Sequence, residues 1–200
     1  MTAPSPGPST RRSPRRRYAA SVAHSANLLR ALARDVESRG EELGRTHLAA
    51  PLDHPSARDA ITLLGWQGPT PTPVVEWALG LSQSACVRVL DRLQEAGLVE
   101  RSRSVGDRRV WVRLTDDGER AVEDIHAVTT DLVQDLLTRA FPDPEALAAA
   151  TGALERLVAV AVGEDVNSAR FCSRCDVRAC LAEGLECPSD QTCEANASRS

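Results

Sequence analysis

Residues 81–118, LSQSACVRVLDRLQEAGLVERSRSVGDRRVWVRLTDDG, constrain the fold of this chain more than any other stretch. They begin with an amphipathic pattern that predicts a helix capped by Ser82 and ended by Gly97. Two runs with strand-like alternation follow, LVERS and VWVRL, and the VGD turn between them predicts a two-stranded hairpin. The residues expected on the inward face of the helix are Cys86, Val89, Leu90 and Leu93.

Helical patterns flank this stretch on both sides. On the N-terminal side we expect a helix over residues 19–46, a short helix capped by Ser56, and a second short helix, PVVEWALG, that ends at Gly80. On the C-terminal side, Thr115 and Asp143 are the expected caps of two longer helices, the second of which ends near Gly163. Only 3% of the residues are aromatic, so the core must consist mostly of Leu, Val and Ala.

Together these elements predict a mainly α fold with a small β-hairpin wing. Two short helices, a polar-faced helix and an arginine-bearing hairpin follow one another in the order of a winged helix-turn-helix. Long helices flank it at both ends.

Positive charge is segregated along the chain, although the net charge is −4. Residues 1–17 carry five arginines and no acid, and residues 82–113 carry seven arginines against four acidic residues. Residues 116–165 carry twelve acidic residues against three arginines. A weakly acidic chain can still bind a polyanion when its positive charge lies on one surface. Solvated helix faces are the alternative explanation of such charges.

The polar face of the predicted helix between Ser82 and Gly97 suits the major groove of DNA. Arg88 and Arg92 lie one turn apart on it and can reach base edges or phosphates. Arg108 and Arg109 lie at the tip of the hairpin, where they can enter the adjacent minor groove.

The same stretch resembles the DNA-binding core of the MarR family of bacterial transcription regulators. The similar features are RLQEAGLVER at the end of the helix, DRR in the wing, and the LT..G pattern before the next helix. The resemblance implies that Arg109 lies in the minor groove, that Asp107 holds it there, and that Ser82, Ser84 and Arg88 face the major groove. It also implies a homodimer formed by the first and last helices. The full set of predicted DNA-binding residues is Ser82, Gln83, Ser84, Arg88, Arg92, Arg103, Asp107, Arg108 and Arg109.

Ala85 and Val87 depart from the family's commoner pattern, in which hydroxyl side chains at these positions often touch DNA. Contacts from these two positions are therefore not expected. A second hypothesis is a winged helix that binds only proteins, with the arginines as surface charge. No glycine-rich phosphate loop or paired nucleophile and base points to an enzyme.

The expected organisation has five parts. A disordered basic arm covers residues 1–17, and a dimerisation helix with its linker covers residues 18–55. The winged helix-turn-helix covers residues 56–118, dimerisation helices cover residues 119–166, and a cysteine-rich tail covers residues 167–200. No run of 18 apolar residues indicates a membrane span, so we expect a soluble cytoplasmic protein.

The tail contains five of the six cysteines of the chain. Cys172, Cys175, Cys180 and Cys187 have the spacing C-x2-C-x4-C-x6-C, and Cys193 follows. In a cytosolic DNA-binding protein such spacing favours metal or redox chemistry over structural disulfides. Four thiolates can hold zinc or an iron–sulfur cluster. The third alternative is thiol switching without metal.

The position of the tail suggests what it does. It follows the last helix, so metal or cluster occupancy could change the dimer geometry, which predicts a repressor that senses metal or redox state. The alternative is a permanent zinc staple in a regulator that responds to a small aromatic ligand, as is common in the family.

Overall fold

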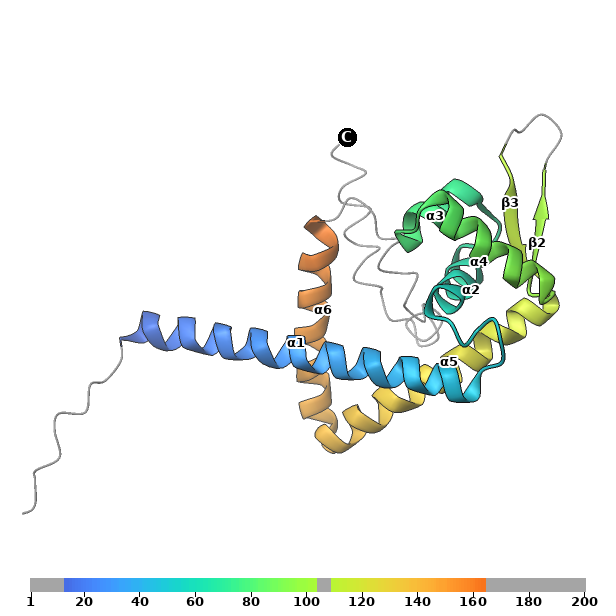
Figure 1. Cartoon of the computed structure of the whole chain (residues 1–200). Coiled ribbons are helices and arrows are strands. Elements are labelled where there is room, and N and C mark those ends of the chain that lie inside the picture. The colour runs from blue at the N-terminus through green and yellow to red at the C-terminus, as the bar shows by residue number, and fades with distance from the viewer. Residues whose placement is uncertain (1–12, 104–108, 165–200) are drawn as a thin grey trace, which may run out of the picture. The chain divides into compact units, whose positions relative to one another are not determined.

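The computed structural model describes residues 13–103 and 109–164 (Figure 1). Helices and short strands follow one another within these two ranges. In chain order they are α1 (Pro14–His47), α2 (Pro55–Gln67), β1 (Thr70–Pro71), α3 (Thr72–Leu79), α4 (Gln83–Glu95), β2 (Val99–Ser102), β3 (Trp111–Leu114), α5 (Asp116–Ala140) and α6 (Pro144–Glu164). The mainly α fold with a β-hairpin wing, expected from the sequence, is confirmed.

The helix α1 begins earlier than expected, at Pro14 instead of near residue 19. Residues 14–17, expected within a disordered arm, are therefore helical. Proline suits the first position of a helix because its missing N–H would have no partner there. The chain divides into two compact units at Arg39 and Gly40, within this helix. Large side chains on the first unit are exposed, namely Tyr18, Val22, Leu28, Leu29 and Leu32.

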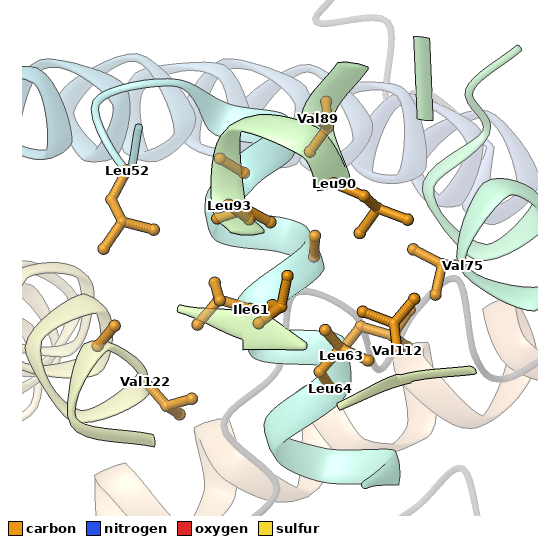
Figure 2. Packing of buried hydrophobic residues seen from close by; sticks show 14 of the residues in the cluster. Leu52, Ile61, Leu63, Leu64, Val75, Val89, Leu90, Leu93, Val112 and Val122 are labelled. Atoms are coloured by element: carbon orange, nitrogen blue, oxygen red, sulfur yellow. The ribbon is translucent and has the colours of Figure 1, made fainter. Parts of the chain in front are cut away.

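The core of the second unit is built from the winged helix-turn-helix elements. Ile61, Leu63 and Leu64 of α2 are at most 1% exposed and lie at its centre (Figure 2). Val75 of α3 and Val112 of β3 pack into the same cluster. All four residues expected on the inward face of α4 are buried, and this confirms the predicted helix face. The other members come from neighbouring elements and include Val99, Ala121, Val122 and Ile125.

The wing has one strand more than expected. In the three-stranded antiparallel sheet, β3 lies between β2 and the two-residue strand β1. Thr70 is opposite Val112, and Pro71 is opposite Trp111. The backbone N–H of Thr72 also donates to the Val110 carbonyl at 2.9 Å. The hairpin is thereby bonded to the start of α3.

The predicted helix caps are confirmed in all cases but one. The hydroxyls of Ser82 and Thr115 accept from the backbone N–H groups three residues on, at 3.4 and 3.0 Å. Asp143 accepts from Ala146 N–H at 3.1 Å. The prediction for Ser56 is wrong, because α2 begins at Pro55 and His54 is its N-cap residue, without a side-chain bond.

A buried arginine joins the end of α1 to α2. Arg58 is only 7% exposed, and its Nη1 donates to the carbonyls of Leu52 at 2.9 Å and Asp53 at 3.1 Å. Gly44 faces this guanidinium so closely that a Cβ there would overlap Nη1. The absence of a side chain at Gly44 therefore leaves room for the Arg58 guanidinium. Arg58 in turn fixes the segment between α1 and α2 through its bonds to the Leu52 and Asp53 carbonyls.

Replacing Arg58 with methionine should lower the free energy of unfolding by about 1–3 kcal/mol, because two carbonyls lose their donor while the stem length is kept. The matched control is Arg45→Met, since Arg45 pairs with Glu42 on the surface and both side chains are about 60% exposed. The control should change stability by less than about 0.5 kcal/mol. Urea denaturation of both variants measures the difference, and equal effects would contradict a special role for Arg58.

Candidate DNA-binding surface

The helix α4 presents a polar face opposite its buried one. Gln83, Ser84, Arg88 and Arg92 are exposed, as their positions in the amphipathic pattern require. Cys86, Val89, Leu90 and Leu93 anchor the other face at 4% exposure or less. The helix is therefore fixed from beneath, and its polar side chains are free to meet a partner.

The N-terminal end of α4 carries two hydroxyls side by side. Ser82 Oγ lies 3.3 Å from Ser84 Oγ while it also caps the helix. Two turns further on, in the last turn of α4, Arg92 Nε donates to the Arg88 carbonyl at 3.3 Å. The positive charge of Arg92 thus lies along the helix, next to Arg88. The exposed face of α4 thus combines hydroxyl donors and acceptors at its start with cationic groups further along, the set used to read base edges and phosphates.

Two of the predicted DNA-binding arginines in the wing are exposed and lie among the described residues. Arg103 follows β2 and Arg109 precedes β3. The Arg109 guanidinium carbon lies 5.4 Å from the centre of the Trp111 ring, within cation–π range. Asp107 and Arg108, also predicted to bind DNA, lie outside the described residues. The predicted hold of Asp107 on Arg109 therefore stays a prediction.

Two arginines of the basic stretch pair with acidic residues of neighbouring elements. Arg101 Nη2 lies 2.8 Å from Asp91 Oδ1, and Arg113 Nη2 lies 2.6 Å from Glu100 Oε2. The second pair joins directly opposed residues of β2 and β3. Neither arginine was among the predicted DNA-binding residues. A count of charges in the sequence thus overstates the free positive charge of this surface.

Cys86 is a core residue, as its inward helical position predicts, and not a reactive thiol. It is 1% exposed. Burial, helped by the charge of Glu76, raises the pKa of the Cys86 thiol to about 11, although Arg101 opposes the shift. The neutral thiol is therefore the form that the fold accommodates.

The raised pKa of Cys86 predicts a loss of stability at alkaline pH. The thiol ionises near pH 9 in the unfolded chain but only near pH 11 in the folded one, so its contribution is complete below pH 9 and is lost as the pH rises to 11. The loss should be on the order of 2 kcal/mol. Denaturation of wild type and Cys86→Ala at pH 8 and 10.5 tests this, because the tail thiols are common to both. Parallel pH dependence in the two proteins would contradict it.

A half-open pocket of about 310 Å³ lies between α2, β3 and α5. Its size is at the lower end of the range for small-molecule sites. Its lining residues include Gly65, Gly68, Arg113 and Glu119.

The predicted metal ligands Cys172, Cys175, Cys180 and Cys187 lie outside the described residues, as does Cys193. Within residues 13–103 and 109–164, no three His, Cys, Asp or Glu side chains form a group that could hold a metal ion. Over the same residues, no helix is both long and apolar enough to cross a membrane.

Comparison with known proteins agrees with this geometry. A sequence model of the MarR family matches residues 74–110, which include most of α3, all of α4 and β2. The matched residues include Arg88, Arg92, Arg103 and Arg109. The match therefore falls on the lobe that carries the predicted DNA-binding surface.

Solved structures share the fold over a longer stretch. A MarR family protein from Bacillus stearothermophilus superposes with a TM-score of 0.60 at 24% identity, over 68% of this chain and 92% of that one. YusO from Bacillus subtilis gives 0.57 at 19% identity, over 74% and 98%. MepR, a transcription regulator of the Staphylococcus aureus multidrug efflux pump MepA, gives 0.56 at 15% identity, over 68% and 96%.

The chain thus has the winged helix-turn-helix fold of these solved structures, and the MarR family model matches residues 74–110 within it. The resemblance inferred from residues 81–118 is confirmed by the family match and by the fold.

Proposed function

We propose that this protein is a sequence-specific DNA-binding transcription regulator that binds double-stranded DNA through α4 and the wing. The observation that carries the proposal is the exposed polar face of α4, with Ser84 and Arg88, held by a fully buried opposite face. Arg103 and Arg109 extend the cationic character onto the adjoining wing. An α-helix with this polar face fits the major groove, and a hairpin beside it can follow the backbone into the minor groove.

The chain's own upstream DNA is the first duplex to test, since such regulators often control their own promoter. A mobility shift should show binding to this duplex at protein concentrations at which a shuffled duplex of equal composition stays free. Equal affinity for the two duplexes would reject sequence-specific binding. Failure to bind either would favour the second hypothesis, a winged helix that contacts only proteins.

The regulator acts as a homodimer in this proposal. Support comes from apolar side chains that a single chain leaves exposed on α1 and from Leu154, Leu157 and Val160 on α6, which are 46–66% exposed. Burial of each such side chain stabilises by about 1.5–3 kcal/mol. Packing against a second copy of the chain would bury them. Two copies would place two α4 helices on half-sites about one helical turn apart.

The finer part of the proposal is repression under the control of metal or redox state. It rests on the cysteine spacing alone, because four thiolates are a suitable donor set for zinc or an iron–sulfur cluster. Cys172, Cys175, Cys180 and Cys187 would hold the group. Bound there, it would link these four cysteines to one another.

An absorption spectrum and elemental analysis of protein purified without oxygen distinguish the possibilities. Stoichiometric iron with a broad visible band indicates a cluster, and one zinc per chain without colour indicates a zinc site. Cys172→Ser and Cys175→Ser should lower the metal content and change the affinity for the operator. Unchanged metal content and affinity would reject the sensing role.

If zinc is bound but its removal leaves DNA binding intact, the signal must enter elsewhere. A small aromatic ligand is then the alternative effector. The zinc site of the tail would in that case have a structural role only.

A further inference from the structure

We propose that Arg101 is a positioning residue for DNA binding, which holds α4 against the wing without touching DNA. The inference rests on the proposed function, because it assigns a role within the same DNA-binding surface. Sequence reasoning placed Arg101 in the basic stretch and gave it no role.

The contacts of Arg101 join the two elements that carry the predicted DNA contacts. Its side chain leaves β2 and reaches α4, where Nη2 lies 2.8 Å from Asp91 Oδ1 and 3.4 Å from the Val87 carbonyl oxygen. Asp91 and Val87 are one turn apart, so the guanidinium contacts two successive turns of the helix. A rotation of α4 relative to β2 would break both contacts.

The direction of the side chain follows from the strand. Along β2, Val99 is buried, Glu100 is exposed and Arg101 is half-buried, so Arg101 shares the inward side with Val99. Its side chain is 23% exposed, against 57% for Arg113, which pairs with Glu100 on the outer side. An arginine at an inward strand position is directed away from a partner that approaches the outer surface.

The guanidinium of Arg101 depends on its contacts with α4. Its Nε is enclosed and has no hydrogen-bond partner among the described residues. An enclosed donor without a partner costs about 1–3 kcal/mol, so the arrangement persists only because other interactions hold the side chain in place. The ion pair with Asp91 and the bond to the Val87 carbonyl are those interactions.

The inference can be tested by whether removal of the Asp91 carboxylate raises or lowers the affinity for DNA. Asp91 and Glu95 are acidic residues one turn apart on α4, and Glu95 is exposed. If charge alone mattered, the removal of either carboxylate would strengthen the binding of phosphates. If Arg101 positions α4 through Asp91, the loss of Asp91 should weaken binding to the operator although a negative charge has gone.

The experiment measures the affinities of Asp91→Ala, Arg101→Met, the double variant and the control Glu95→Ala for the operator and for a shuffled duplex, over a series of salt concentrations. Each of the first three should bind the operator about tenfold more weakly, and the double variant should be no weaker than the singles, because the two residues act as one unit. Affinity for the shuffled duplex and the salt dependence should stay as in wild type. Glu95→Ala should not weaken binding.

Three results would overturn the inference. If Arg101→Met reduces the salt slope by about one, Arg101 contacts a phosphate. If affinity falls equally for both duplexes, the variant has lost folded protein and not the correct placement of α4. If Asp91→Ala binds more strongly, Asp91 affects binding only through its negative charge. A wild-type chain that never discriminates the operator rejects the proposed function itself, on which the inference rests.

Discussion

Gly118→Ala should lower the free energy of unfolding by about 3 kcal/mol, the largest stability effect that we expect from a single methyl group. A Cβ at Gly118 would overlap the carbonyl oxygen of Leu98, and the side chain of Leu114 lies 3.2 Å away. The same carbonyl accepts from Thr115 N–H at 3.1 Å, so it cannot retreat without loss of that bond. Glycine at this position therefore allows the first turn of α5 to approach the residue before β2.

The matched control is Gly152→Ala in α6. There the nearest group to an added Cβ is Arg156 Nη1, at an ordinary contact distance of 3.6 Å. Alanine favours a helix over glycine by up to about 1 kcal/mol, so this variant should be slightly more stable than wild type. Thermal and urea denaturation measure both changes. If Gly118→Ala is as stable as wild type, the close approach of α5 to Leu98 is wrong.

Arg88→Ala should weaken binding to the operator about 10- to 100-fold, because a well-placed arginine contact to a base edge is worth about 1–3 kcal/mol. Arg88 is exposed on the polar face of α4, one turn after Ser84. It is not part of the core, so the variant should unfold at the same urea concentration as wild type. Fluorescence anisotropy with a labelled operator duplex measures the affinity.

The control for Arg88→Ala removes an equal charge far along the chain. Arg139 pairs with Asp135 on α5, and their side chains are 74% and 61% exposed. Arg139→Ala should leave the affinity within about twofold of wild type, since surface pairs of this kind contribute little. Equal losses in the two variants would show that binding depends on net charge only, and Arg88 would then have no specific role.

The fold could be predicted well where the signals are local. The spacing of Cys86, Val89, Leu90 and Leu93 gave the buried face of α4, because helical periodicity and burial coincide there. Ser82 and Thr115 were recognised as caps for a similar reason, since a cap bonds within the next three residues.

What the sequence did not predict depends on contacts between distant residues. The strand β1 has only two residues, one of them proline, so it has no alternation to detect, and it exists only through its pairing with β3. Arg101 looked like its exposed neighbours because its partner Asp91 comes from another element. Alternation along VERS carried a signal, since Arg101 occupies the same side as Val99.

A hydroxyl-radical footprint of the wild-type protein on its operator tests the central claim most directly. We predict two protected segments related by twofold symmetry and centred about 10 base pairs apart, as two α4 helices of one dimer would produce. Their protection should be lost in Arg88→Ala at a concentration that saturates wild type. Uniform protection along any duplex, or protection that Arg88→Ala retains in full, would contradict recognition of DNA by α4.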